Sequence, residues 1–350
     1  MVSGMRLQPG HRRIATVVVS VLVFLLLLVV GTTVAVPFVA LGPGPTVNTL
    51  GTLDDKKVVA IEGVPTDPTT GNLNLTTVSV SDGMSLFQAI GMWLSGTYTL
   101  EPRDRLFPPE QSRDQVREQN QQEMSNSESD ASVAALRYLN RPTKMQVDDV
   151  AGDGPSKNAL RKGDQVVRVA ATPVTSVPQV QAAVRAQKPG ATIPIDIVRG
   201  GQPQTVTVTL GQRPDDPKVA YLGATVNEVN ADPALKIDFN VGDIGGPSAG
   251  MMLTLAVIDK LSPGELTHGK FIAGTGTISD DGKVGPIGGI THKTKAARDA
   301  GATVFLVPEK NCAEATSNAP DGLDLIKVTD LQSAITSLGD IGAGKPAPHC

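Results

Sequence analysis

The sequence has little of what several common kinds of functional site require. Only 3% of its 350 residues are aromatic, four are histidine, and the net charge is −4. No basic stripe with interleaved aromatic residues occurs, so a nucleic-acid partner is not expected. The histidines include no pair at a metal-ligand spacing, so no metal site is expected either: His11, His268, His292 and His349. No Gly-x-x-x-x-Gly-Lys-Ser/Thr phosphate loop is present, and no cofactor is predicted.

Cysteine is almost absent, because the chain has only Cys312 and Cys350. In an oxidising compartment two cysteines are more often paired than free. A Cys312–Cys350 disulfide would hold the C-terminal tail, residues 341–350, against the last domain. Two unrelated thiols are the alternative.

Charge is missing from a long segment near the N-terminus. Residues 14–36 are nearly all aliphatic, which is long enough to cross a bilayer core of about 30 Å. Three arginines precede this run, and the first charges after it are Asp54 and Asp55. This asymmetry predicts a single-pass anchor in the cell membrane, with residues 1–13 cytoplasmic and the remainder extracytoplasmic. A cleaved signal peptide is the alternative, although its apolar core is usually only about 7–15 residues long.

Residues 37–142 form a predicted extracytoplasmic N-terminal region. It opens with Gly42-Pro43-Gly44-Pro45, which we interpret as a stiff, turn-rich exit from the membrane. The patterns that follow predict two strands, a short amphipathic helix containing Trp93, a polar helix and a second helix: 58–61, 73–80, 85–94, a helix starting at Ser112, and 131–139.

Residues 143–212 change to a β-rich pattern. Leu160-Arg161-Lys162-Gly163-Asp164 forms a turn before an alternating strand, 177–186 has helical spacing, and Arg199-Gly200-Gly201 ends another strand. This block resembles a bacterial PDZ domain. The resemblance implies binding of an extended peptide end at a sheet edge, with the carboxylate-binding loop near residues 138–141. A small β domain that acts only as a spacer is the alternative.

Residues 213–340 are predicted to form an α/β unit in which Ser248 is the most informative residue. Ser248 follows Gly246-Pro247 and precedes an apolar run. The pattern predicts a helix over 248–261 with the serine hydroxyl in its first turn. There, free backbone N–H groups can stabilise a developing anion. The other elements expected are strands at 271–278, 304–307 and 323–328 and helices at 291–300 and 330–338.

A candidate base for this serine lies downstream. A serine hydroxyl is a weak nucleophile until a neighbouring base takes its proton, and a lysine can do so once burial lowers its pKa. Lys293 follows the glycine-rich segment 285–289, with Lys295 as its rival. Thr275, in Gly274-Thr275-Gly276, could orient the amine. His292 has no carboxylate at a matching spacing, so a Ser-His-Asp triad is not predicted.

Several motifs in this unit resemble the proteolytic domain of Lon proteases, in the same order and at similar spacing over residues 219–338: Pro247-Ser248-Ala249-Gly250, Thr275-Gly276, Pro286-Ile287-Gly288-Gly289-Ile290 to Lys293, Ala296-Ala297-Arg298, Ala300-Gly301-Ala302, and Val307-Pro308 to Asn311. The resemblance implies that Ser248 is the nucleophile and Lys293 the general base. The turn Gly246, Pro247 and Ala249 would supply the oxyanion site. Lon-type domains commonly form rings, so the resemblance allows a homo-oligomer, but the sequence does not fix the number of subunits.

The complete layout is similar to membrane-anchored Lon-like proteases of Gram-positive bacteria. Two departures favour ATP-independent action on short, extended or unfolded segments: the phosphate loop is missing, and Gly245 occupies a position that is acidic in many ATP-dependent Lon enzymes. We therefore predict a multidomain α+β protein with a transmembrane helix, a PDZ-like domain and a Lon-type serine endopeptidase that acts on membrane-proximal proteins or peptides. The alternative is a PDZ scaffold with an inactive Lon-like domain. A signal-peptidase type of Ser-Lys protease fits the motif context less well.

Overall fold

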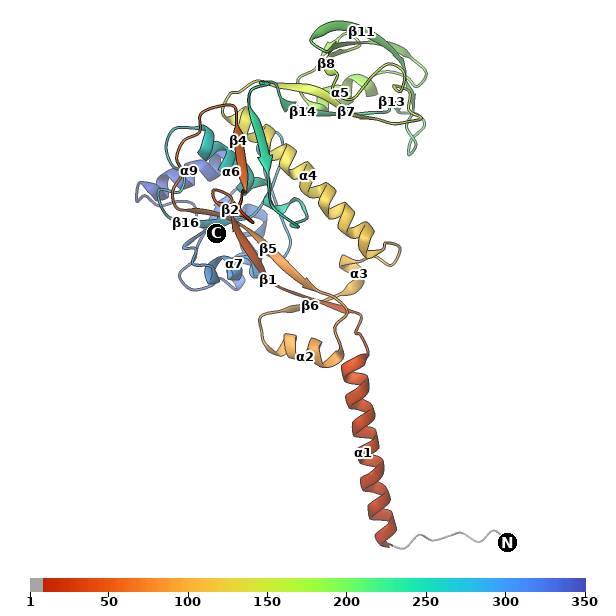
Figure 1. Cartoon of the computed structure of the whole chain (residues 1–350), viewed down its shortest axis with the longest axis vertical. Coiled ribbons are helices and arrows are strands. Elements are labelled where there is room, and N and C mark those ends of the chain that lie inside the picture. The colour runs from red at the N-terminus through yellow and green to blue at the C-terminus, as the bar shows by residue number, and fades with distance from the viewer. Residues whose placement is uncertain (1–8) are drawn as a thin grey trace, which may run out of the picture.

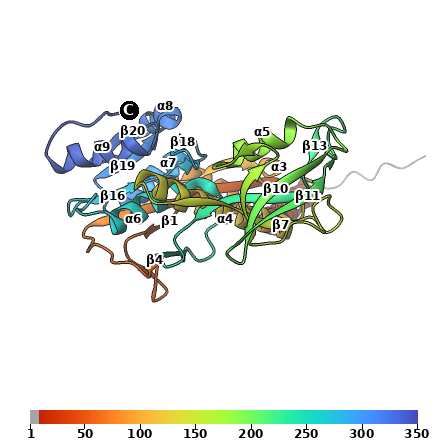
Figure 2. The ribbon, with the colours of Figure 1, turned by 90° about the horizontal axis from the view of Figure 1, so that it is seen from above.

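The computed structural model describes residues 9–350, with side chains from Ile14 onwards. The chain forms two folded bodies that lie side by side, and helix α1 (Pro9–Thr33) projects from the larger one (Figures 1 and 2). Within the described chain, one stretch, Ile14–Thr33, is long and apolar enough to cross a membrane, by a test that a signal sequence near the N-terminus would also pass. The predicted cytoplasmic segment 1–13 falls largely outside the described residues.

The larger body is built on a six-stranded sheet in the order β20-β19-β16-β5-β1-β6. The strands are β1 (Phe38–Asn48), β5 (Asn72–Ser81), β6 (Thr99–Pro102), β16 (Phe271–Gly274), β19 (Val304–Pro308) and β20 (Asp324–Val328). Strands β5, β16, β19 and β20 run parallel, and β1 is antiparallel to both β5 and β6. Residues 37–142 therefore do not stand apart, because three of their strands complete the sheet of the C-terminal unit.

Helices cover both faces of this sheet. In β19, Val304 and Leu306 pack into the core with α4 (Arg113–Tyr138), α6 (Gly250–Leu261) and α9 (Leu331–Gly342). The alternate residues Phe305 and Val307 pack on the other side. There they meet α7 (Ile290–Asp299) and α8 (Cys312–Ser317). A strand buried on both faces explains why 304–307 is continuously apolar.

The Gly-Pro segment 42–45 is part of a strand and does not form the predicted turn. It lies inside β1, which pairs with β5 through a register shift between Pro43 and Thr46. An irregularity of this kind tolerates proline, which cannot donate to a regular ladder. Gly44 lies against the backbone of Thr77, too closely for a Cβ atom. The two glycines and two prolines thus shape a bulged strand.

The polar region expected to hold two helices forms one, α4. Its start agrees with the prediction, since Ser112 and Gln115 form a capping box. No break occurs at Ala131. Met124 and Ser127 are already buried, and from Ala131 the helix packs more continuously into the core against α6. The change at residue 131 is therefore a change of environment, towards fuller burial, within one helix.

The smaller body has its own core and a five-strand path in the order β11-β10-β8-β7-β14. These strands are β7 (Thr143–Val150), β8 (Gln165–Val169), β10 (Thr192–Arg199), β11 (Gln202–Thr209) and β14 (Ala224–Asn230), and α5 (Val177–Arg185) packs beside them. The body therefore continues to Asn230, beyond the predicted boundary at residue 212. Burial alone would raise the pKa of the Asp164 carboxyl. The hydrogen bonds that this carboxylate accepts from Arg199 and from the Arg161 amide outweigh burial, so its pKa lies below the ordinary value.

Short elements complete the fold. They are β2 (Thr52–Leu53) paired with β3 (Lys56–Lys57), β4 (Val59–Glu62) with β15 (Lys236–Phe239), β9 (Thr172–Pro173) with β8, β12 (Gly211–Gln212) with β13 (Ala220–Tyr221), and β17 (Thr277–Ile278) with β18 (Val284–Gly285). Short helices are α2 (Leu86–Leu94), α3 (Arg103–Leu106) and the 3₁₀ turns η1 (Pro247–Ala249) and η2 (Glu309–Asn311).

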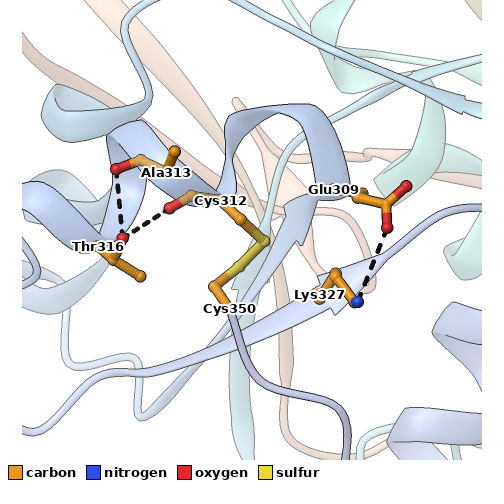
Figure 3. The surroundings of a disulfide bond; sticks show 6 residues. All are labelled: Glu309, Cys312, Ala313, Thr316, Lys327 and Cys350. Atoms are coloured by element: carbon orange, nitrogen blue, oxygen red, sulfur yellow. Dashed lines mark hydrogen bonds and ion pairs between the residues drawn. A yellow bond between two sulfur atoms is a disulfide. The ribbon is translucent and has the colours of Figure 1, made fainter.

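The C-terminal tail is held to the larger body. Cys312, at the start of α8, and Cys350 form a disulfide (Figure 3). The amide of Cys350 also donates to Leu325 O at 3.0 Å, and the amide of Lys327 donates to Pro348 O at 2.8 Å. The tail therefore lies along β20.

Candidate active site

Ser248 lies in a tight turn one step before the long buried helix. The turn is η1 (Pro247–Ala249), and α6 begins only at Gly250. The predicted helix start at Ser248 is therefore two residues too early, because Gly246 enters the turn at φ +84° and the chain first forms a 3₁₀ turn. Positive φ at this angle favours glycine. The serine is presented from a turn whose following helix is buried along its length.

The structure brings together three of the predicted site residues. The Nζ atom of Lys293 lies 2.8 Å from Ser248 Oγ and 3.0 Å from Thr275 Oγ1. Lys293 reaches this point from the first turn of α7, which begins after Gly289 at φ +68°. An amine between two hydroxyl groups is well placed to exchange a proton with the serine.

Neither neighbour of Lys293 shares this arrangement. Lys295 forms an exposed ion pair with Asp299 at 3.2 Å, one helical turn further along α7. The His292 Nε2 atom lies 2.8 Å from the hydroxyl of Thr99 in β6. Burial lowers the pKa of His292 below its ordinary value.

Thr275 owes its position to a break in the predicted strand 271–278. Strand β16 ends at Gly274 and β17 begins at Thr277. In the gap, the Thr275 hydroxyl donates to Ser248 O at 3.0 Å and the Gly276 amide donates to the same oxygen at 2.9 Å. The amide of Met251 returns a bond to Gly276 O at 3.1 Å. These bonds tie the serine turn to the sheet.

Burial sets the electrostatics of the site. The Lys293 residue is only 3% exposed, and desolvation lowers the pKa of its amine from 10.5 to about 8. The buried amine is held by hydroxyl groups instead of a carboxylate. A substantial fraction of neutral amine is therefore present near neutral pH.

Helix α4 supports the serine turn from behind, a role that the sequence analysis missed. Ser127 Oγ donates to Pro247 O at 3.1 Å, and the Gly246 amide donates to Asn120 O at 2.9 Å. A Cβ at Gly245 would lie 3.0 Å from Asn120 Cβ, so the helix occupies the place of a side chain there. The polar run that encodes this half of α4 gives no signal for these contacts.

These contacts correct the predicted oxyanion turn. Gly246 shapes the turn, but its N–H is bound to Asn120. Pro247 has no N–H to donate. Of the three predicted residues, neither Gly246 nor Pro247 therefore offers a free N–H to an oxyanion.

A second unpredicted support is Asn311, in η2. Its buried side chain accepts from the Ile287 amide at 3.0 Å and donates to Ile287 O at 2.9 Å. This pair of bonds fixes the 286–288 loop that leads into α7. The sequence signal for Asn311 was its place at the end of the Val307-Pro308 to Asn311 motif, which resembles Lon domains.

Ser248 and Lys293 lie in a cleft of about 1030 Å³. Its walls are formed by the loop 241–245, the loop 286–288, and paired segments of β1 and β5. The volume is large enough for several residues of an extended chain. Among the side chains described, from Ile14 onwards, His, Cys, Asp and Glu form no group of three that could hold a metal ion.

The smaller body has a groove of its own, about 580 Å³ in volume. It lies between α5 and β14, which ends its sheet, and includes the segment 221–224 that leads into β14. The prediction that placed a carboxylate-binding loop at residues 138–141 is wrong in position. Tyr138 and Leu139 pack against the core of the larger body.

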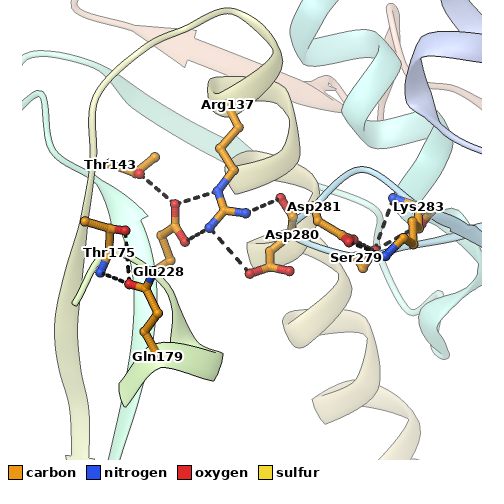
Figure 4. Close-up of polar contacts among 9 residues, drawn as sticks. All are labelled: Arg137, Thr143, Thr175, Gln179, Glu228, Ser279, Asp280, Asp281 and Lys283. Atoms are coloured by element: carbon orange, nitrogen blue, oxygen red, sulfur yellow. Dashed lines mark hydrogen bonds and ion pairs between the residues drawn. The ribbon is translucent and has the colours of Figure 1, made fainter. Parts of the chain in front are cut away.

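The two bodies meet at Arg137, near the end of α4 (Figure 4). Its guanidinium forms two hydrogen bonds to the buried carboxylate of Glu228 in β14. It also donates to Asp280 O at 3.1 Å, in the turn between β17 and β18. Thr143 donates to the same Glu228 carboxylate at 2.6 Å. One arginine thus joins the groove-bearing body to the body that holds Ser248.

Comparison with known families finds two domain models in this chain. Residues 115–210 match the model of the PDZ domain, and residues 230–338 match that of the Lon protease (S16) C-terminal proteolytic domain. The chain therefore combines a PDZ domain with a Lon-type proteolytic domain. The PDZ match begins within α4, whereas the folded PDZ body comprises the strands from β7 to β14.

The relatives include proteins named as Lon proteases. Lon protease 2 of Bacillus subtilis is 29% identical over 134 residues, 38% of this chain and 21% of that protein. Lon protease of Mycoplasma genitalium is 34% identical over 131 residues, 34% of this chain and 16% of that protein. The chain thus spans about a fifth or less of these two relatives. Among solved structures, the PDZ domain of an SdrC-like protein from Listeria monocytogenes is 19% identical, over 24% of this chain and 86% of that one, with a TM-score of 0.22.

Proposed function

We propose that this protein is an ATP-independent serine endopeptidase that uses a Ser248–Lys293 dyad. The observation that supports it most is a buried lysine amine, with its pKa lowered to about 8, at 2.8 Å from the hydroxyl of a serine in a cleft. The family match to a Lon proteolytic domain supports the same chemistry.

In the proposed reaction, the neutral Lys293 amine takes the proton of Ser248 as Oγ attacks the scissile carbonyl carbon. The backbone amides of Ser248 and Ala249 stabilise the oxyanion. The protonated amine then gives its proton to the leaving nitrogen, and the peptide bond breaks to leave an acyl-enzyme. Water, activated by the same amine, hydrolyses that ester. Thr275 orients Nζ by accepting a hydrogen bond from it.

The substrates we propose are extended or unfolded segments of membrane-proximal proteins. The sequence has no phosphate loop, so no motor of its own would unfold a substrate, and the cleft suits a chain already extended. The apolar helix Ile14–Thr33 supports a single-pass tether, and the three arginines that precede it favour a catalytic body outside the cytoplasm.

The PDZ groove would receive a peptide segment of the substrate or of a regulator. Strand β14 ends its sheet beside α5, so a peptide strand could add to its free edge. The preceding Tyr221-Leu222-Gly223 segment, with Gly223 at φ +72°, would then meet the peptide's carboxylate.

The test is hydrolysis of casein, an unfolded protein, by the full chain in detergent without nucleotide. We expect wild type to be active, Ser248→Ala and Lys293→Ala to be inactive with unchanged circular dichroism, and the matched control Lys295→Ala to keep its activity. Activity retained in Lys293→Ala would show that another group is the base. Activity absent from wild type as well, with or without ATP, would favour a PDZ scaffold.

A further inference from the structure

Helix α2 (Leu86–Leu94) exposes an unusually large apolar surface. Five large side chains of this nine-residue helix face solvent, including Trp93 at 62% and Leu94 at 70% exposure: Leu86, Phe87, Ile90, Trp93 and Leu94. Within the helix only Ala89 is fully buried. Single exposed apolar residues are common, but a contiguous group marks an interaction surface.

This surface lies at the end of α1 where the candidate membrane span stops (Figure 1). The ring of Phe87 packs on Gly31, where a Cβ would come within 2.5 Å of it. The Val36 amide donates to Met84 O at 2.9 Å, and an isolated bridge pairs Ala35 with Ser85. The position of α2 relative to α1 is therefore fixed by backbone bonds and by a ring contact.

The surroundings of α2 are also apolar. Between Gly83 and Glu101 the sequence contains no Asp, Glu, Lys or Arg, so α2 itself carries no charge that would lose its hydration in an apolar phase. Three more exposed apolar side chains belong to the neighbouring segments, in the linker after α1, in β1 and in β5: Val34, Phe38 and Val80.

We propose that α2 lies flat in the membrane–water interface, with its apolar side chains in the outer edge of the bilayer; this rests on the proposed tethering by α1. The occupant is lipid because the surface is continuous with a helix that would itself be in lipid. A tryptophan and a phenylalanine on an uncharged apolar face suit the headgroup boundary. Together α1 and α2 hold the proteolytic body in one orientation at the membrane, which a single helix could not do.

Trp93 is the only tryptophan in the chain, so its fluorescence reports on α2 alone. The full chain is reconstituted into phosphatidylcholine–phosphatidylglycerol vesicles that carry bromine at shallow or deep positions of the acyl chains. We expect blue-shifted emission, quenching that is strongest with shallow bromines, and little quenching by aqueous iodide. The double variant Ile90→Glu, Leu94→Glu should lose the bromine quenching and gain quenching by iodide. Val167→Glu, the same change at an exposed apolar residue of the PDZ body, should keep the wild-type response.

Flotation of the vesicles separates this inference from the tethering on which it depends. Protein that floats while Trp93 is quenched by iodide and not by bromolipid would overturn the interfacial helix and leave the tether intact. Protein that does not float would overturn both. Emission that is blue-shifted without bromolipid quenching, and that shifts to the red on dilution, would mean that a second copy of the chain covers α2. That result would also overturn the interfacial helix. Casein hydrolysis in detergent by the double variant would show that it remains folded.

Discussion

The buried amine of Lys293 makes a specific prediction about pH. If this amine is the base, kcat/KM should rise with pH as the amine loses its proton and level off above its pKa of about 8. With the pKa at about 8, roughly a tenth of the amine is neutral at pH 7. At the ordinary value of 10.5 the neutral fraction would be about 0.03%, so burial supplies about a 300-fold gain, equivalent to about 3 kcal/mol. Between pH 6 and pH 9, activity should therefore increase by roughly 100-fold.

The assay is cleavage of a fluorogenic peptide by the full chain in detergent, across this pH range, on wild type and two variants. Lys293→Arg should be inactive at every pH, because a guanidinium stays protonated. His292→Gln should keep the wild-type profile, because the His292 ring contacts Thr99 and does not form part of the Ser248–Lys293 pair. A flat profile would refute the argument. So would an inflection at or below about 6.5 that disappears in His292→Gln, since a histidine titrates there.

Three further predictions concern Lys293, Thr275 and the Cys312–Cys350 disulfide. Lys293→Met should be more stable than wild type at pH 7 by up to about 3 kcal/mol in chemical denaturation. The folded-state pKa of Lys293 is lowered from 10.5 to about 8. The resulting loss of stability in wild type is therefore complete below pH 8 and disappears as the pH rises towards 10.5. Equal stability of the two proteins at pH 7 would contradict this. Thr275→Val should reduce kcat tenfold or more and also lower the Tm, because the buried Nζ of Lys293 and the Ser248 carbonyl lose a hydroxyl partner worth about 1–3 kcal/mol. Thr275→Ser should restore both. A Val variant with wild-type kcat would remove Thr275 from the mechanism. Cys350→Ser should lower stability by about 4 kcal/mol, as expected for opening a loop closed over a sequence separation of 38; reducing agent should lower the Tm of wild type and leave that of the variant unchanged.

The pair at the centre of the site could be predicted because its signals are local. Ser248 and Lys293 each follow a glycine-rich segment, and each segment fixes the start of the element that presents the side chain. The strand 304–307 was also predictable, since its continuous apolar run needs both faces buried. That Ser248 and Lys293 lie close together was predicted only from the resemblance to Lon domains, because spacing alone cannot specify a contact across 45 residues.

The missed features depend on contacts that leave little trace in composition. Asn120 and Ser127 lie in the polar N-terminal half of α4, where the sequence does not distinguish the residues that hold the serine turn from those that face water. Pro43 within β1 is tolerated only because the register shifts beside it. That irregularity is set by the partner strand, which lies about thirty residues away in the sequence.

The junction at Arg137 fixes the PDZ domain to the proteolytic body. The connection is not a flexible linker, because α4 leads directly into β7 and its Arg137 pairs with a Glu228 carboxylate that is 2% exposed. Removing a carboxylate from water is costly unless its partner is in place, so we infer that the two bodies keep one relative orientation. The same helix holds Pro247 through Ser127, 10 residues before Arg137. The edge strand of the PDZ groove and the turn that presents Ser248 therefore rest on one rigid element, and a peptide bound at β14 would lie in a fixed direction from the proteolytic cleft.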